Sequence, residues 1–231
     1  MSWVLAPGVL AQARRPFPDT DWVGRNLDLI GEKLLEHLQL TALSLLFGLA
    51  IAIPLAVLAV RFRVLYTPLL AITGVLFTIP SLALFVLILV VLGTGLTITT
   101  AVIGLTIYSL LILFRNTVAG LDSVPADIRE AADAMGYTRR QRLFRVEFPV
   151  ALPVIVTGIR IATVTTIGLV TVTALIGQGG LGRLFLDGFR RRNTTELVIG
   201  FALSIILAVV ADLALLAVQR GLTPWARSRR A

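Results

Sequence analysis

An uncharged run of 51 residues, from Val64 to Phe114, is the feature that most constrains the fold of this chain. At a rise of about 1.5 Å per residue, a helix of that length would extend roughly 76 Å. That is about two and a half times the hydrocarbon thickness of a bilayer, so the run predicts two membrane spans. We place the turn between them at Gly93-Thr94-Gly95 and a kink in the first of them at Thr78-Ile79-Pro80-Ser81.

Three further apolar stretches have the length of a span. Leu38–Val60 carries no charge, Pro149–Ile176 is interrupted only by Arg160, and Leu197–Val218 only by Asp212. Because an ionised side chain inside a bilayer needs a partner, we expect Arg160 and Asp212 to pair between the last two spans. The chain is therefore predicted to be an all-α integral membrane protein with about five transmembrane helices and its ends on opposite sides.

The hydropathy pattern divides the chain into three parts. Residues 1–32 are expected to form an extramembrane tail, residues 33–220 a single transmembrane domain, and residues 221–231 a basic cytoplasmic tail. If the polar insert after the third span is cytoplasmic, that side gathers twelve arginines and the other side eight basic residues, which is the direction that the positive-inside rule favours.

Several functional classes are excluded or disfavoured by what the sequence lacks. There is no cysteine, and hence no disulfide or thiolate nucleophile, and the single histidine, His37, cannot build a metal site. We assign His37 an interfacial role at the mouth of the first span. The basic clusters lie outside apolar runs rather than on a soluble face with stacking aromatics, which argues against nucleic acid and suits membrane lipid or protein partners. No Gly-x-x-x-x-Gly-Lys-Ser/Thr motif is present to hold ATP phosphates.

The polar insert, residues 125–153, reads as two short helices. Ser123 is expected to cap the first helix, and Gly136 to end it in the left-handed conformation. Thr138-Arg-Arg-Gln141 has the spacing of a capping box and predicts a second helix that runs until Pro149.

An apolar face follows the first of these helices at i, i+3, i+4 and i+7 spacing, formed by Ile128, Ala131, Ala132 and Met135. The small alanines allow the backbone of another protein to approach closely. Two interpretations remain open: the face enters a groove of a partner, or it packs on the protein's own span ends or in the lipid interface.

The insert resembles the EAA loop of ABC-importer permeases. Glu130-Ala131-Ala132 is followed after three residues by Gly136 and, after nine more, by Val146-Glu147-Phe148-Pro149, in which Val146 and Phe148 are conservative departures from the family pattern. The resemblance implies a type I ABC-importer permease fold, with residues 123–149 forming coupling helices that insert into cytoplasmic ABC ATPase subunits. It assigns coupling to Glu130, Ala131, Ala132, Gly136 and Pro149. ATP and Mg²⁺ would then be on the partner ATPase, with no cofactor on this chain.

Other segments resemble the osmoprotectant group of these permeases, which import glycine betaine, choline and carnitine. They are Ile79–Phe85, Arg115-Asn116-Thr117, Gly158-Ile159-Arg160 and Ile176–Gly182. The resemblance implies a multi-pass protein of the inner (plasma) membrane, with an extracytoplasmic substrate-binding protein and a second permease copy or paralogue as partners. The alternatives are a permease for methionine or another amino acid and, less favoured, an ATPase-independent secondary transporter, which would need internal repeats and a midplane coupling site.

Two sets of candidate residues follow for transport itself. The first comprises Pro80, Ser81, Arg115, Asn116 and Thr117 as residues of the translocation pathway. Arg115 and Asn116 lie near a predicted cytoplasmic helix end, so snorkelling of their side chains to the interface explains them equally well.

The second set is glycine-rich and comprises Gly177, Gly179, Gly180 and Gly182, within the segment Gly177–Gly182 that matches the spacing Gly-x-Gly-x-x-Gly. No βαβ unit surrounds them, so a dinucleotide site is not predicted. We expect an irregular turn after the fourth span, which either serves as a moving gate or simply ends the helix.

Overall fold

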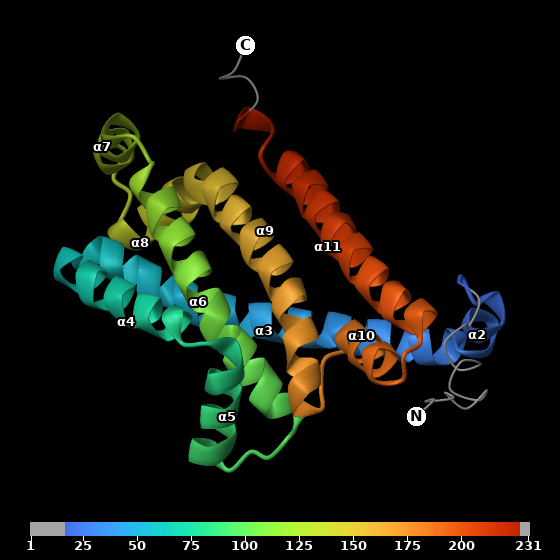
Figure 1. Ribbon diagram of the computed structural model, residues 1–231. Helices are drawn as coiled ribbons and strands as arrows, with labels where there is room; N and C mark the ends of the chain where they lie inside the picture. The colour runs from blue at the N-terminus through green and yellow to red at the C-terminus, as the bar shows by residue number, and fades with distance from the viewer. Residues whose placement is uncertain (1–16, 227–231) are drawn as a thin grey trace, which may run out of the picture.

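The computed structural model describes residues 17–226, and throughout that part of the chain the regular secondary structure is helical (Figure 1). Long apolar helices are α3 (Leu27–Arg61), α6 (Ile98–Asp122), α9 (Phe148–Val172) and α11 (Thr194–Leu222). A fifth apolar segment is broken into α4 (Tyr66–Thr78) and α5 (Ser81–Leu92), which meet at 101°. The prediction of an all-α protein with about five spans is thus confirmed.

Shorter elements connect the spans. They are α2 (Thr20–Arg25), the 3₁₀ turn η1 (Arg63–Leu65), α7 (Ala126–Ala134), α8 (Arg139–Arg142), the π turn η2 (Leu143–Glu147), the 3₁₀ turn η3 (Thr173–Ile176), α10 (Leu181–Arg190) and the 3₁₀ turn η4 (Pro224–Ala226). Figure 1 shows α7 and α8 at one end of the molecule and α2 at the opposite end.

Contacts between the ends of the spans show that the bent pair α4–α5 crosses the bundle once. Arg63, just before α4, donates two hydrogen bonds of 2.6 and 2.8 Å to the carboxylate of Asp122 at the end of α6. At the other end, Gln178 Nε2 donates to the carbonyl of Leu96 in the loop after α5. The pair therefore starts on the side of the polar insert and finishes on the opposite side, giving five crossings in all.

The core is built where α3, α6 and α9 cross. Ala52, Ala56 and Ala59 of α3 are fully buried against Leu113 and Phe114 of α6. Small side chains at such a crossing let the helix backbones approach closely, which is the usual mode of packing in a bilayer. The most apolar stretch of α11, in contrast, contributes no residue to the buried interior, so this helix lies at the edge of the bundle.

An ion pair joins α11 to α9, as the sequence predicted. Arg160 Nε and Nη2 lie 2.9 and 2.8 Å from the two carboxylate oxygens of Asp212. Gln219, two turns further along α11, donates 2.8 Å and 3.2 Å hydrogen bonds to the carbonyl of Pro153 and the hydroxyl of Thr157. The pair and the amide thus attach an otherwise peripheral helix at successive turns.

The expected kink at residues 78–81 is a complete break. Pro80 has no N–H to continue the helix, and Ile79 is extended, with ψ of 128°. The carbonyl of Ile79 accepts a hydrogen bond from the hydroxyl of Tyr108 in α6, and the Tyr108 ring packs edge-on against Phe77. The sharp bend is stable because a distant side chain satisfies the freed carbonyl. The turn predicted at Gly93 is confirmed, with φ of 61° at that residue.

His37 is buried inside the protein, which the sequence did not indicate, and its position at the membrane interface stays a prediction. Its side chain is fully buried, and Nε2 donates a 3.1 Å hydrogen bond to the carbonyl of Ile167 in α9. Helix α3 begins ten residues earlier, at Leu27, so His37 lies within the helix, one residue before the uncharged stretch that starts at Leu38.

Candidate functional site

The first helix of the polar insert starts differently from the prediction. Ser123 is the C-terminal cap of α6, and its hydroxyl donates to the carbonyl of Gly120. Helix α7 begins at Ala126 after Pro125, which has no side-chain group to accept a capping hydrogen bond. The prediction of a Ser123 cap is wrong because α6 extends to Asp122, one residue before the serine.

The end of α7 matches the prediction. Gly136 adopts φ of +78°, and its N–H donates to the carbonyl of Asp133 while the N–H of Tyr137 donates to that of Ala132. This pair of bonds is the Schellman arrangement, in which glycine is favoured because it has no Cβ to clash. The capping box is also present: the backbone N–H of Gln141 donates to the Thr138 hydroxyl, and the Gln141 amide oxygen accepts from the Thr138 N–H.

The second helix does not stop at Pro149. Helix α8 passes through the π turn directly into α9, and Pro149 occupies the first turn of α9. The continuous helix accommodates Pro149 because this residue lies just after the π turn, where the regular i→i−4 hydrogen-bond pattern is interrupted. The insert therefore consists of one separate short helix, α7, and an extension of the fourth span.

The predicted apolar face of α7 is divided between the inside and the outside. Ala132 is 1% exposed, and Ile128 packs beside the core cluster that includes Leu121. Ala131 and Met135 are exposed, and Met135 is 70% accessible. Two residues of the face therefore pack on the protein's own span ends and two are exposed, and contact of the exposed pair with a partner stays a prediction.

Glu130 is exposed beside Ala131, which leaves its carboxylate accessible at the surface. An exposed acid, two apolar side chains and a glycine turn form a protruding patch, defined here as Glu130, Ala131, Met135 and Gly136. The patch is chemically suited to enter a groove of another protein, and it has no arrangement for catalysis.

An ion-pair cluster at the base of α7 was missed by the sequence reasoning. Glu147, Arg129, Arg142 and Asp133 form it, and Glu147 is only 8% exposed. The signal available in the sequence was that Glu147 is the only acid between Asp133 and Asp187, within a run of arginines. The sequence did not indicate the π turn, which directs the side chain of Glu147 toward Arg142.

The candidate pathway residues fall into two separate places. Pro80 and Ser81 lie at the break between α4 and α5, where the Pro80 carbonyl accepts a 2.9 Å hydrogen bond from the N–H of Leu84 in the first turn of α5. Asn116 and Thr117 face the bundle: the Asn116 Cβ lies against Gly158 of α9, and Thr117 is 1% exposed. No hydrogen bond joins the two groups within residues 17–226.

Arg115 is exposed near the end of α6 and forms no ion pair with the residues that the structure describes. Both interpretations of this residue, snorkelling and substrate contact, remain compatible with its position.

The glycine turn after the fourth span is tightly packed. Gly177, Gly179 and Gly180 have φ of +85°, +127° and +50°. A Cβ on Gly180 would lie 2.6 Å from the backbone nitrogen of His37, and one on Gly182 would lie 2.5 Å from the Thr171 carbonyl oxygen. The turn therefore requires glycine both for conformation and for space.

A carboxylate from the first span holds this turn. Glu36 Oε1 accepts hydrogen bonds from the N–H groups of Gly179 and Gly180 at 3.0 and 3.1 Å, and its Oε2 lies 2.9 Å from Lys33 Nζ. The negative charge also sits at the N-terminal end of α10, where the helix dipole favours it. The turn is thus linked to α3, on the side of the bundle opposite to α7.

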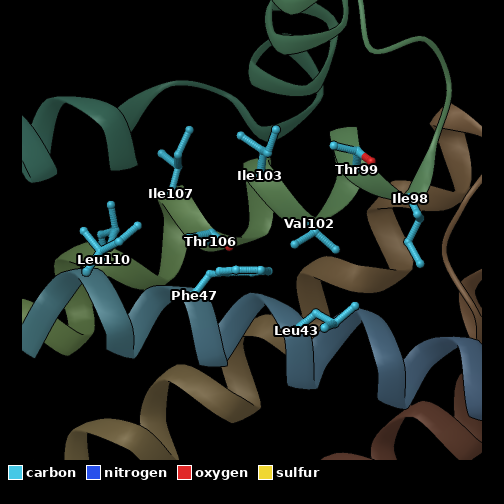
Figure 2. Close-up of a pocket in the computed structure, with 10 residues that line it drawn as sticks. Leu43, Phe47, Ile98, Thr99, Val102, Ile103, Thr106, Ile107 and Leu110 are labelled. Carbon is cyan, nitrogen blue, oxygen red and sulfur yellow. The ribbon is translucent and has the colours of Figure 1, made fainter.

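An apolar groove of about 620 Å³ lies between α3 and α6 (Figure 2). Its walls are aliphatic and aromatic, with Phe47 of α3 facing Val102 and Thr106 of α6, and the Thr106 hydroxyl already donates to the carbonyl of Ser44. Apart from the hydroxyls of Thr99 and Thr106, the lining of the groove is apolar and uncharged, which does not suit a charged solute. Within the described residues, no group of three or more His, Asp or Glu side chains could hold a metal ion.

Comparisons with known proteins agree with this geometry. The chain is 42% identical to the osmoprotectant import permease protein OsmW of Salmonella typhimurium, over 86% of this chain and 94% of that one. It is 34% identical to the glycine betaine/carnitine/choline transport system permease protein OpuCD of Bacillus subtilis, over 88% of each chain. A chain of the inward-facing MetNI methionine ABC transporter matches with a TM-score of 0.75 at 28% identity, over 85% of this chain and 97% of that one.

The family model for binding-protein-dependent transport system inner membrane components matches residues 44–228. The matched region contains most of α3 and all of the later spans, including α7 with its exposed patch and the glycine turn. This chain belongs to the family of binding-protein-dependent transport system inner membrane components.

Proposed function

We propose that this chain is the membrane-spanning subunit of an ATP-driven importer of osmoprotectants such as glycine betaine or choline. The observation that carries the proposal is the 42% identity to an osmoprotectant permease, which extends over 86% of the chain and includes the exposed helix α7. The amino-acid alternative is supported by likeness to a methionine transporter at 28% identity, which is the weaker similarity.

In this proposal the energy source is a separate ATPase. The patch of Glu130, Ala131, Met135 and Gly136 supplies the surface on which ATPase subunits dock, with ATP and Mg²⁺ held by those subunits. The family to which the chain belongs is named for a binding-protein-dependent system, so an extracytoplasmic binding protein would deliver the solute at the end where α10 and the glycine turn lie. A second permease, identical or paralogous, would complete the pathway.

The aromatic residues support delivery by a separate binding protein. Quaternary ammonium groups are held in cages of several aromatic rings. The ring pairs Tyr66–Phe114, Phe77–Tyr108 and Phe144–Phe148 are separate from one another and share no ring. Such pairs do not make a cage, so selection of the solute is assigned to the partner.

The test is reconstitution of the permease with its ATPase and binding protein in proteoliposomes, followed by uptake of radiolabelled glycine betaine, choline and methionine. ATP-dependent uptake of a quaternary ammonium compound is the expected result. Uptake of methionine alone would assign the chain to the amino-acid class, and uptake by the chain without ATPase would refute the proposal.

A paired substitution tests the docking patch. Gly136→Val should abolish substrate-stimulated ATP hydrolysis while the protein remains inserted, because a β-branched residue cannot adopt φ of +78° at low cost. Gly136→Asn is the matched control, since asparagine tolerates the left-handed conformation and a Cβ at this position meets nothing within 4 Å. Equal hydrolysis by the Val variant and the wild-type complex would count against the docking role.

A further inference from the structure

Helix α7 has few apolar contacts with the rest of the protein. Ile128 and Ala132 face the spans, while the patch defined above is exposed. A force that a partner exerts on this patch must therefore reach the spans mainly through other contacts. The ion-pair cluster beneath α7 supplies them.

The cluster centres on the carboxylate of Glu147. Its Oε1 accepts a 3.0 Å hydrogen bond from Arg142 Nε, and Arg129 Nε lies 3.5 Å from the same oxygen. Arg142 also pairs with Asp133 of α7, and Arg129 Nη2 donates a 2.6 Å hydrogen bond to the carbonyl of Leu121. One carboxylate thus links α7, α8 and the start of α9, and Arg129 adds the end of α6.

The charges of the cluster balance, with two guanidinium groups facing two carboxylates. Glu147 is 8% exposed, so loss of its charge would leave two cations without their shared partner at the base of α7. The neighbouring Arg139, Arg140 and Arg145 are exposed and lie outside the cluster. Because these exposed arginines stay apart from it, the cluster is an electrically neutral group within an otherwise basic segment.

The π turn is what brings Glu147 to Arg142. Residues five apart in an ordinary α-helix point about 140° away from each other, given 3.6 residues per turn. Leu143–Glu147 forms the wider i→i+5 turn, and Arg142 and Glu147 meet across it. Such π turns are rare and cluster at functional sites.

From these contacts we infer that Glu147 is a positioning residue, which transmits the movement of α7 to the spans α6 and α9 through Arg129 and Arg142. This inference rests on the proposed function, in which α7 is the element that the ATPase moves. Glu147 does not itself face the partner, because it lies beneath α7 rather than on the exposed patch.

The test combines two readouts on Glu147→Gln, which keeps the shape and removes the charge. In the reconstituted complex we expect the ATPase to co-purify and basal hydrolysis to persist, whereas substrate-stimulated hydrolysis and uptake fall at least about tenfold. Asp127→Asn is the matched control: Asp127 is an exposed carboxylate on the same helix, with no ion pair in the described structure, and it should leave coupling unchanged. Normal coupling in Glu147→Gln would overturn the inference.

The second readout needs no partner. Because the chain contains no cysteine, a single spin label at Met135→Cys would report the mobility of α7 in the permease alone. Glu147→Gln should increase that mobility, and Asp127→Asn should not. An unchanged spectrum in both variants would refute the role of Glu147 in holding α7 on the spans. If Glu147→Gln loosens α7 but the permease couples to no ATPase, the proposed function is refuted. The role of Glu147 in holding α7 on the spans is then retained.

Arg142→Gln serves if Glu147→Gln does not fold, because it opens the same cluster from the other side and leaves Arg129 on Glu147. The same loss of coupling and gain of α7 mobility is expected, in a milder form. Wild-type behaviour of this variant in both assays would also overturn the inference.

Discussion

At Gly158, α9 packs closely against Asn116 of α6, and adding one methyl group there should separate the two helices. An alanine Cβ at this position would lie 2.2 Å from the Cβ of Asn116. Ordinary carbon–carbon contacts lie at about 3.5–4.0 Å, so the helices would have to move apart by roughly 1.5 Å. A change of rotamer cannot relieve the clash, since the Asn116 Cβ is fixed to the backbone of α6.

The expected cost is that of an overpacked core, about 1–3 kcal/mol. For a chain of this size that corresponds to a fall of roughly 4–8 °C in unfolding midpoint for a cost of about 2 kcal/mol. Thermal unfolding of the purified permease in detergent measures it.

Gly168→Ala is the matched control on the same helix, because a Cβ there meets nothing within 4 Å. Alanine is a better helix former than glycine by about 0.5–1 kcal/mol, so this variant should be equal to or slightly more stable than the wild type. The double variant Gly158→Ala, Asn116→Gly removes the opposing Cβ and should recover part of the loss. A midpoint for Gly158→Ala at or above that of the wild type would refute the steric argument.

Three further predictions concern contacts between distant segments. Gly180→Ala should destabilise the glycine turn and impair uptake, because φ is +50° and a Cβ would meet His37; a wild-type midpoint and rate would contradict this. Asp212→Asn should lower the yield of folded protein, and the charge swap Arg160→Asp with Asp212→Arg should restore it; failure of the swap would argue against pairing as their role. Tyr108→Phe keeps the ring and removes the hydrogen bond at the α4–α5 break, so uptake should fall. Unchanged uptake would show that the bend does not need this hydrogen bond.

The predictions that held concern hydropathy and local backbone chemistry. Long uncharged runs located the spans, because apolar length is what a bilayer requires. Gly93, Gly136 and the capping box of Thr138 were correct because turn and cap geometry depends on a few adjacent residues. The pair of Arg160 and Asp212 was correct because two lone charges in facing spans have few alternative partners.

The predictions that failed required knowledge of which distant groups meet. Ser123 had the right chemistry for a cap, but the length of α6 decided that it would end one helix rather than begin the next. His37 was placed at the mouth of a span, and the sequence did not indicate that packing of α3 against α9 would bury its side chain. Neither outcome can be read from neighbours in the sequence.

The sequence by itself therefore determined the approximate number of spans, the presence of a short helix in the polar insert and the glycine turn that ends it, since these depend on composition and spacing along the chain. Only the tertiary structure decided that α4 and α5 break at 101°, that Glu36 holds the glycine turn, and that Glu147 joins α7 to the spans. The reason is physical: a freed carbonyl, an N–H pair or a buried carboxylate is stabilised by whichever partner folding brings within about 3 Å, and that partner can lie anywhere in the chain.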